Sequence, residues 1–406
     1  MMYKFILLIF FITLFDTKAS FSKNDSVNMS VETAFATQNL LHNYNNLRSH
    51  NKSNVNIKLG YAKKNLSSQL SLNLYDNNKL SFDNSYVNYQ KGIFNLNIGK
   101  IDRIWSFSDK SSLILSSNAK PLEAVSLKFE NNFNANWLPT NSKFSIEVLN
   151  ASTKGSYQGN DSVLSGARIL ISPLKNLDFE IFQTSQWDRK NNKINPSTIG
   201  TIILGNTNEG PYANINKMAG FGVSYSIPTN ENNYRIYGQA VGEDEAGNLP
   251  SCFAWMSGIE LSLPNIKLPT ITTFELIDTR VPYSTNGNCG PNTMYGNSNY
   301  KYTNYGTVLG APIDSESTSL EIFGKTKLSE NLNFHFSKKI VTINDKNYTA
   351  HRLSKKRSSG SIISLGISWV QKNFNVAGNI SYQNLTLDQK KIAPGIIFSI
   401  ISSMEF

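Results

Sequence analysis

The last twelve residues, GIIFSIISSMEF at 395–406, decide the fold of this chain. In an extended strand successive side chains point to opposite faces, so alternate positions of this stretch share one face. That face is apolar except at one position, and it ends on an aromatic residue. Its members are Ile396, Phe398, Ile400, Ser402, Met404 and Phe406. The pattern predicts a β-strand with one face suited to apolar surroundings.

A closing strand that ends on Phe406 resembles the recognition signal of bacterial outer-membrane barrels, although Ser402 stands where an apolar residue is usual. The composition agrees, because 18 Tyr, 23 Phe and 5 Trp suit the aromatic girdles of such barrels. Asn- and Ser-rich stretches suit turns and a polar lumen. The alternative is a soluble β-protein that ends in Phe by chance. The sequence favours an all-β, transmembrane antiparallel β-barrel.

The other end of the chain reads as an export signal. One Lys precedes an apolar run from Phe5 to Phe15, and the small-residue site Thr17-Lys18-Ala19 follows, as in a secretory signal peptide. The run is too short to span a bilayer as a helix. We predict a cleaved signal peptide at 1–19, an N-terminal segment at 20–53 and the barrel at 54–406, in the outer membrane of a Gram-negative cell.

Alternation at period two recurs along the chain in segments of about ten residues, which is the length of a transmembrane β-strand. Asn, Gly, Pro, Asp and Ser separate these segments, as expected for turns. The predicted strands are 54–62, 66–76, 79–90, 93–101, 122–132, 142–152, 163–172, 176–187, 218–227, 232–243, 250–263, 269–279, 316–329, 332–343, 361–372, 374–386 and 395–406.

The parity of the long interruptions tests this strand count. In barrels of this kind both chain ends face the periplasm, so long outer loops follow odd-numbered strands. The long interruptions are 102–121, 188–217, 280–315 and 344–360. All four follow odd strands only if a weakly alternating segment, Val27 to Ala36, is strand one. With that segment the barrel has about 18 strands, an even number typical of wide barrels.

Three segments resemble, in the same order, signature stretches of the capsule-assembly protein Wzi family. They are GKIDRIWSFSDKSSLILSSNAKP at 99–121, FEIFQTSQW at 179–187 and YRIYGQAVGEDEAGNLPS at 234–251. The run Asp314-Ser315-Glu316-Ser317 looks like that family's acidic-serine lead into a late strand. The resemblance implies an outer-membrane barrel of about 18 strands. It also implies a protein that binds surface polysaccharide and helps to hold a capsule or exopolysaccharide layer on the cell.

The first of these segments lies at the outer mouth by the parity argument, and we expect it to fold back and plug the lumen. Its apolar run Leu113-Ile114-Leu115 has no lipid to face there, so it is predicted to pack with Trp105. Its charges are expected to pair with lumen groups such as Arg168 and Arg235. The pair Asp102-Arg103 either pins this plug or contacts sugar carboxylates and hydroxyls.

The hairpin at 242–247 carries three acids, Glu243, Asp244 and Glu245, beside glycines. A glycosidase needs two carboxyl groups about 5 to 10 Å apart across a sugar. Side chains on neighbouring turn residues diverge, so catalysis is the minor interpretation. We expect ion pairs with lumen Arg or Lys, or a cation site of carboxylate and carbonyl oxygens.

The only two cysteines, Cys252 and Cys289, fall on one side of the membrane near the outer rim. Export into an oxidising compartment permits a disulfide between them. We predict this bond as a structural restraint on the large loop 280–315.

Sugar binding favours exposed aromatic rings, which stack on sugar C–H faces, together with amides and charges that satisfy hydroxyls. The candidates are Asp102, Arg103, Trp105, Tyr212, Tyr295, Tyr300, Tyr302, Arg352 and Lys355. Tyr and Asn are also ordinary loop and girdle residues, so any one of them has a structural alternative. The net charge of +10 favours anionic neighbours such as lipopolysaccharide or acidic polysaccharide, unless it reflects nucleotide bias.

The four histidines show no arrangement with Ser or Asp that suits a hydrolase, and no Cys or His spacing suits a zinc site. We therefore predict a non-enzymatic surface lectin without metal or cofactor that attaches or organises capsule or exopolysaccharide. The expected partners are this polysaccharide, lipopolysaccharide and outer-membrane lipid, with no nucleic acid and a monomeric barrel. The alternative function is a passive porin for small solutes.

Overall fold

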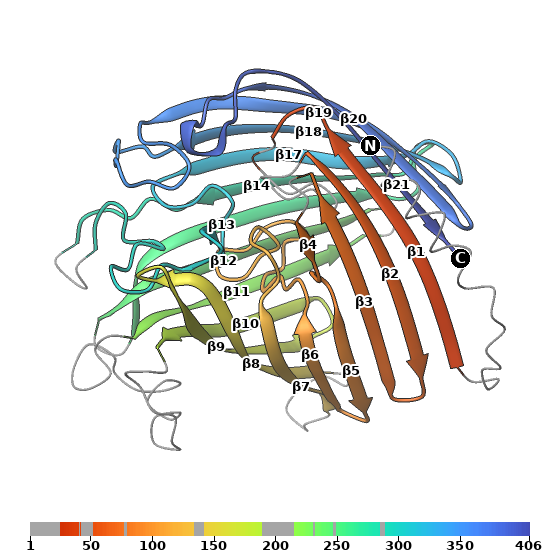
Figure 1. Ribbon diagram of the computed structural model, residues 1–406, viewed down its shortest axis with the longest axis horizontal. Helices are drawn as coiled ribbons and strands as arrows, with labels where there is room; N and C mark the ends of the chain where they lie inside the picture. The colour runs from red at the N-terminus through yellow and green to blue at the C-terminus, as the bar shows by residue number, and fades with distance from the viewer. Residues whose placement is uncertain are drawn as a thin grey trace.

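The chain forms a closed barrel of 18 antiparallel strands (Figure 1). The structure is a computed structural model, and the fold prediction is confirmed in it. Every strand of the ring pairs with the next along the chain, and the last strand, β21, pairs with the first, β1. The described residues are 25–39, 41, 52–76, 79–133, 142–188, 215–229, 232–246, 249–284 and 289–406.

The strands of the ring follow the predicted segments closely. They are β1 (Asp25–Ala36), β2 (Ser53–Lys63), β3 (Leu66–Tyr75), β5 (Tyr86–Lys91), β6 (Phe94–Lys100), β7 (Glu123–Phe133), β8 (Ser142–Tyr157), β9 (Asn160–Leu174), β10 (Leu177–Trp187), β11 (Asn216–Pro228), β12 (Asn233–Ala246), β13 (Leu249–Leu263), β14 (Thr270–Asp278), β17 (Thr318–Lys327), β18 (Leu332–Ile343), β19 (Ser358–Gln371), β20 (Phe374–Asn384) and β21 (Gly395–Glu405).

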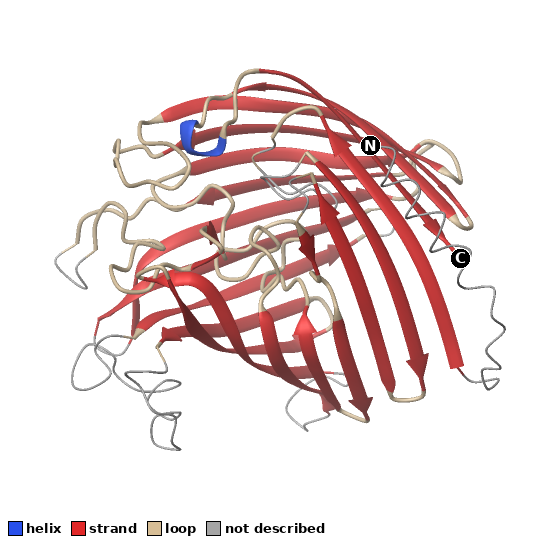
Figure 2. Ribbon diagram, viewed as in Figure 1, coloured by secondary structure: helices blue, strands red, loops and turns tan. Residues whose placement is uncertain are grey.

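Three short strands and one short helical turn lie outside this ring. They are β4 (Leu80–Ser81), β15 (Thr303–Asn304), β16 (Thr307–Val308) and the 3-10 turn Asp388–Lys390. Figure 2 shows the helical turn among the loops at one end of the barrel. Across the described ranges, no helix has the length and apolar character needed to cross a membrane.

The weakly alternating segment Val27 to Ala36 is β1, and it closes the ring. Its residues pair antiparallel with β21, from Ser30 opposite Glu405 to Ala36 opposite Ser399. Its other edge pairs with β2 along nearly its whole length. The parity argument that required a strand here is therefore confirmed.

Apolar side chains cover the outer face of the barrel. On β21 the predicted face points outward, with Phe398 and Ile400 55% and 52% exposed. The alternate residue Ile397 is buried and packs with Ala34 on the inner side of β1. The same alternation recurs around the ring, so its outer surface suits the hydrocarbon core of a bilayer.

One predicted strand, 79–90, is wrong in detail because a bulge divides it into β4 and β5. Both pieces pair with β3, but residues 70–72 of β3 face the four residues 82–85. Asn84 takes up the extra residue with a left-handed backbone, φ 65°. Bulges of this kind re-aim a side chain, and here the Asn84 amide is directed at the lumen.

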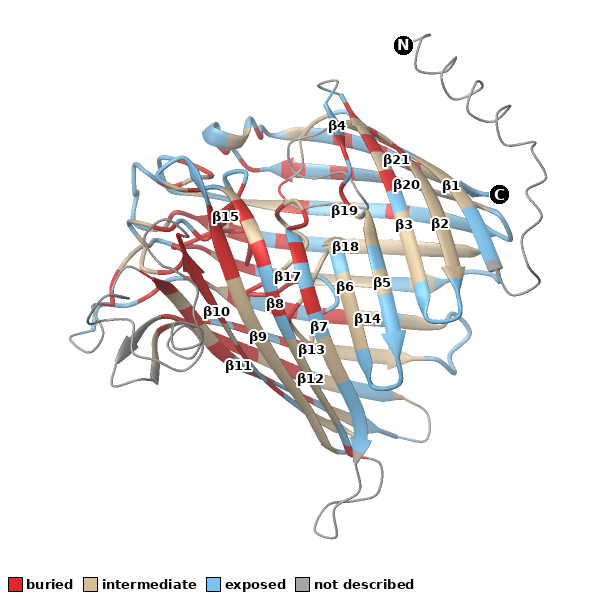
Figure 3. Ribbon diagram, turned by 60° about the horizontal axis from the view of Figure 1, so that its bottom comes forward, coloured by how far each residue is buried: buried red, intermediate tan, exposed pale blue. Residues whose placement is uncertain are grey.

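The long connections leave one end of the barrel, as predicted. They follow β6, β10, β14 and β18, and antiparallel alternation places all four at the same end. Short turns occupy the other end, which is the periplasmic end in barrels of this kind. Buried residues gather toward the loop end (Figure 3), so the packed core fills the outer part of the lumen.

Candidate functional site

Residues 101–121, between β6 and β7, fold into the lumen and form the plug predicted from the sequence (Figure 1). Leu113, Ile114 and Leu115 are buried there in one apolar cluster with Trp105. Gly166 in β9 makes room for this tryptophan, because a Cβ at that position would lie 3.0 Å from the indole ring. The plug thus has an apolar core of its own inside a polar-lined barrel.

A neutral side chain of the barrel wall, Gln239 in β12, holds the backbone of the plug. Its carbonyl oxygen accepts the N–H of Leu113 at 2.7 Å, and its amide donates to the carbonyl of Trp105 at 2.6 Å. The same amide donates to Glu180 at 3.1 Å, and Arg168 donates to Glu180 at 2.9 Å. Arg168 therefore supports the plug through two intermediates rather than by pairing with its charges.

The tip of the plug, Phe107 to Lys110, is tied to the opposite wall by charge. Ser108 donates to Glu275 in β14, and Lys110 lies 3.2 Å from Glu321 in β17. Arg235 donates to the Phe107 carbonyl at 2.6 Å. These contacts place the charges of the first motif in structural roles.

The pair Asp102-Arg103 also binds wall residues. Arg103 lies 3.5 Å from Glu147 and donates to Ser126 at 3.0 Å. The Asn84 amide at the bulge donates to Asp102 at 3.2 Å. Both residues therefore pin the root of the plug to neighbouring strands.

A second layer, formed by residues 279–284 and 289–317, covers the plug from the loop end. Tyr295 donates through its hydroxyl to the Leu113 carbonyl at 2.7 Å, and its backbone N–H donates to Glu243 at 2.9 Å. Its ring stacks on Tyr302 with centroids 5.9 Å apart. Cys252 and Cys289 form a disulfide that joins this layer to the start of β13.

An ion pair locks this second layer to the loop that follows β18. Arg352 donates to Asp314 at 2.8 Å and to the Tyr295 carbonyl at 3.2 Å. Burial alone would raise the pKa of the Asp314 carboxyl, but the adjoining guanidinium outweighs burial and holds that pKa below its usual value. Glu316, two residues on, accepts the backbone N–H of Asn292 at 2.9 Å. The acidic-serine run thus fastens loops to one another.

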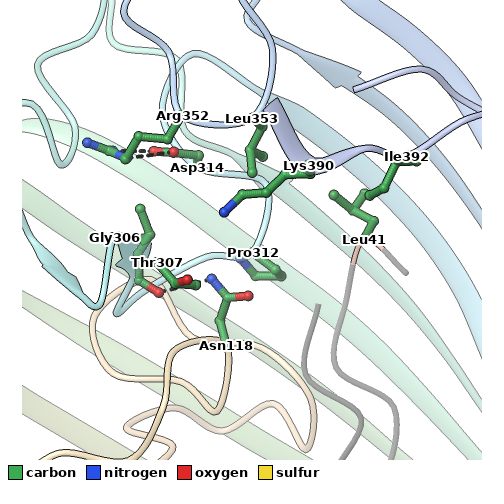
Figure 4. A pocket seen from close by; sticks show the side chains of 11 residues that line it. Leu41, Asn118, Gly306, Thr307, Pro312, Asp314, Arg352, Leu353, Lys390 and Ile392 are labelled. Carbon is green, nitrogen blue, oxygen red and sulfur yellow. Dashed lines mark hydrogen bonds and ion pairs between the residues drawn. The ribbon is translucent and has the colours of Figure 1, made fainter. Parts of the chain in front are cut away.

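Five segments meet at a small pocket on the loop side of the plug (Figure 4). Asn118 comes from the plug, Thr307 from the β15–β16 hairpin, Arg352 from the loop after β18, Lys390 from the loop after β20, and Leu41 from the loop after β1. Figure 4 shows the Asp314–Arg352 pair at its rim. Charged, amide and hydroxyl groups line it beside apolar ones, but its volume of about 10 Å³ has room for a single water molecule and not for a sugar ring.

A larger cavity of about 720 Å³ lies on the other side of the plug. Ser, Asn and charged side chains line it, including Lys339, His335 and the plug residue Asp109. Asn118 and Pro312 line both the cavity and the outer pocket. The closure of the lumen is therefore thinnest at these two residues.

Several predicted sugar contacts are corrected by their burial. Trp105, Tyr295, Tyr300 and Tyr302 are each at most 1% exposed, so their rings pack the loops and offer no face to a sugar. The reason is that period-two alternation carries no information about burial inside folded loops. Arg352 is engaged by Asp314, as described above.

Of the remaining predicted residues, Lys355 and Arg235 have described side chains. Lys355 lies exposed, and Arg235 pairs with Glu260 at 2.8 Å. Asp244 and Glu245 lie near the end of β12, but their side chains, like Tyr212, fall outside the described residues. In the portions of the chain that are described, no three His, Cys, Asp or Glu side chains are grouped to hold a metal ion.

The exposed aromatic rings at the loop end include two tyrosines of the Tyr- and Asn-rich loop 280–315 and one tyrosine of the loop after β18. Tyr283, Tyr305 and Tyr348 are 84%, 57% and 48% exposed. Gln239 in β12 and the pocket residue Lys390 escaped prediction.

An apolar outer face, a closed ring of 18 strands and a lumen filled by the protein's own loops define a plugged outer-membrane β-barrel. The chain belongs to the capsule assembly protein Wzi family, whose model matches residues 15–394. No curated protein sequence gives a significant match.

Several solved structures have the same fold. An outer-membrane protein involved in group 1 capsule assembly in Escherichia coli, described as a carbohydrate-binding β-barrel, is 17% identical with a TM-score of 0.76, over 94% of this chain and 84% of that one. OprD from Pseudomonas aeruginosa is 10% identical with a TM-score of 0.57, over 96% of each chain. OccAB2 from Acinetobacter baumannii is 10% identical with a TM-score of 0.55, over 96% of this chain and 99% of that one.

Proposed function

We propose that this protein binds polysaccharide at the cell surface and attaches or organises capsule or exopolysaccharide there. The observation that carries the proposal is the plug: two layers of loops pack into one buried apolar core in the outer part of the lumen. Membership of the capsule assembly family supports it. The similar E. coli barrel is itself described as carbohydrate-binding.

The contacts proposed for the polymer lie on this loop surface. Exposed rings such as Tyr283 and Tyr348 stack on sugar C–H faces, and the exposed Lys355 attracts anionic groups. Tyr212 remains a proposed contact on its loop.

The same proposal includes a monomeric, non-enzymatic barrel that is exported by a cleaved signal peptide at 1–19. Lipopolysaccharide and outer-membrane lipid are its lateral neighbours, because the strands present an apolar outer face. The plugging contacts use the charges of the first motif for structure, which supports a binding rather than a catalytic role.

A deletion strain tests the role in the cell. Cell-bound and released polysaccharide are measured in the wild type, the deletion strain and the complemented strain. We expect the bound fraction to fall and the released fraction to rise on deletion, with recovery on complementation. Unchanged retention would defeat the proposal.

A passive porin is the second candidate, because the cavity of about 720 Å³ and the likeness to OprD-type barrels favour it. Conductance of the purified protein in planar bilayers separates the two functions. The plug predicts no large stable currents. Large currents together with unchanged polysaccharide retention would favour the porin.

A further inference from the structure

The outer face of β18 carries a charged residue near the middle of an apolar wall. Lys338 pairs across with Ile322 in β17 and with Ile363 in β19, which lie on either side of β18 (Figure 1). Ile340 and Ile363 are 51% and 40% exposed. Lys338 is exposed too, whereas the next residue, Lys339, is buried and lines the cavity in the lumen. The alternation of the strand therefore places Lys338 among side chains that face the lipid.

This charge has no partner within the described part of the chain. Neither a hydrogen bond nor an ion pair joins the side chain of Lys338 to any described residue. Two other lysines near the loop end of the wall differ, because Lys100 and Lys154 lie 3.1 and 3.6 Å from Glu123. A lysine on the lipid face destabilises a barrel, and the effect increases with depth in the bilayer. We therefore look for the partner of Lys338 outside the protein.

The outer face becomes polar directly above Lys338. In the next rows toward the loop end, Ile340 pairs with Ser361 and Thr342 pairs with Ser359. The hydroxyls of Thr342 and Ser359 are exposed and lie 3.1 Å apart. A lysine stem lies along apolar surface and extends its ammonium toward water. The charge of Lys338 is therefore placed at the upper edge of the apolar band, where lipid headgroups begin.

The loop that joins β18 to β19 adds positive charge above this edge. Lys346 and Lys356 are exposed, and no ion pair joins either of them to a described residue. Arg357, the residue before β19, is 54% exposed and lies 2.9 Å from Asp345. One strand pair thus carries cations at two levels, one at the edge of the apolar band and one in the loop. Both levels attract phosphate.

We propose that Lys338 and the loop 344–357 bind one lipid, the phosphorylated headgroup of lipopolysaccharide, on the outer face of β18 and β19. The ammonium of Lys338 pairs with a phosphate of the glucosamine headgroup, and the isoleucines beside it contact the acyl chains. The loop lysines attract phosphates on the sugars above. A phospholipid has its phosphate at one level only, so the two levels of charge favour lipopolysaccharide. The site deepens the lateral lipid contact that forms part of the proposed function.

Substitutions separate lipid binding from a structural role. Lys338→Met removes the charge and keeps an unbranched stem that suits lipid, so the barrel keeps its fold. Lys338→Arg keeps the charge. Lys154→Met is the matched control, because the Lys154 ammonium is already engaged by Asp161 at 2.9 Å. The double variant Lys346→Ser and Lys356→Ser removes charge from the loop level alone.

The probes are rough-type lipopolysaccharide, which carries no long surface polysaccharide, the same lipopolysaccharide after removal of its phosphates, and phosphatidylglycerol. Each is titrated into the full-length protein in detergent, bound lipid is counted by native mass spectrometry, and thermal unfolding is followed in parallel. We expect Lys338→Met to weaken binding of intact lipopolysaccharide about fivefold, as for one lysine near an anionic membrane surface. The loop double variant should also weaken it, whereas Lys338→Arg and Lys154→Met should bind like the wild type. Lipopolysaccharide without phosphates should not distinguish the wild type from Lys338→Met.

Three results would overturn the site. The first is equal binding of intact lipopolysaccharide by the wild type and Lys338→Met. The second is binding of phosphatidylglycerol as tight as that of lipopolysaccharide and equally sensitive to Lys338→Met, which would make the occupant any anionic lipid. The third is a lower melting temperature of Lys338→Met in detergent without added lipid, which would show that the lysine stabilises the protein itself.

Retention of surface polysaccharide by cells that carry each variant separates this site from the proposed function. If the site fails and the function holds, lipopolysaccharide binding is insensitive to Lys338→Met while deletion of the protein still releases polysaccharide. If the function fails and the site holds, lipopolysaccharide binding is sensitive to Lys338→Met while deletion leaves polysaccharide retention unchanged.

Discussion

Gln239 shows how one neutral residue can position a whole segment. It engages two backbone groups of the plug and a carboxylate of the wall, and it is buried. No feature of the sequence predicts this role for a single glutamine in a strand. Its partners Leu113 and Trp105 were visible because they interrupt a regular pattern.

Replacement of this glutamine should loosen the plug. We expect Gln239→Leu to lower the free energy of unfolding by about 1–3 kcal/mol, because the Leu113 N–H loses its buried partner. The conductance of this variant in planar bilayers should rise as the plug loosens. Gln383→Leu is the control, since Gln383 is equally buried but bonds the Ala393 carbonyl in another loop. Equal conductance of Gln239→Leu and Gln383→Leu would contradict the role of Gln239 in holding the plug.

The Asp314–Arg352 pair predicts a pH dependence. The pKa of Asp314 is lowered from 3.8, so the stabilisation is present above the unfolded-state pKa and is lost as pH falls through the lower folded-state pKa. We expect near-UV circular dichroism of the loop tyrosines to stay constant from pH 7 to about 4 and to change below it.

Asp314→Asn should remove this transition and destabilise the loops at every pH, by about 3–5 kcal/mol, because Arg352 is left without its charged partner. Asp345→Asn breaks the more exposed pair with Arg357, whose side chain is 54% exposed, and serves as the control. If the acid transition in circular dichroism persists in Asp314→Asn, it arises from another titratable group.

Among the elements, strands were predictable and loops were not. Period-two alternation located 17 of the ring strands because each has a lipid face and a lumen face, whereas the weak first strand, β1, needed the parity of the long loops as well. The bulge between β4 and β5 escaped because one inserted residue leaves the apolar pattern on either side intact. The burial of Tyr295 and Tyr302 escaped because it depends on contacts between distant loops.

Removal of the plug tests its role as an element. We expect replacement of residues 104–119 by a short Gly-Ser linker to leave the barrel folded, because no ring pairing involves them. The conductance should rise to that of an open barrel of this width. The same linker in place of the exposed residues 346–350 is the control. A shortened protein that stays closed would mean that the second layer, residues 279–284 and 289–317, seals the lumen without the plug.

The disulfide between Cys252 and Cys289 restrains the covering layer, across a sequence separation of 37 residues. A bridge of this span contributes about 2–4 kcal/mol by limiting the unfolded chain. We expect the double Cys→Ser variant to be cleaved faster by trypsin at Arg280 or Lys301, with strand content unchanged. Reductant should accelerate cleavage of the wild type and have no effect on the variant.

At the scale of the whole molecule, the net charge of +10 is expected to make the affinity for an anionic polymer depend on the salt concentration. The Debye length falls from about 10 Å at 0.1 M to about 3 Å at 1 M salt. If the polymer is anionic, as proposed, its affinity should fall roughly tenfold or more over this range. The carboxyl-reduced polymer is the control, and its affinity should change little. Equal salt dependence of both polymers would argue against charge recognition.

The plug also has a mechanical consequence for the barrel. It leaves the ring at β6 and fastens to Glu275 in β14 and Glu321 in β17, on the opposite side of the strand order. It therefore acts as a cross-brace that resists flattening of the ring into an oval. Asn304 in β15 extends this brace, because it bonds the end of the plug at the Lys120 carbonyl and β8 at the Lys154 N–H, so a force on the loop end would be shared between both walls.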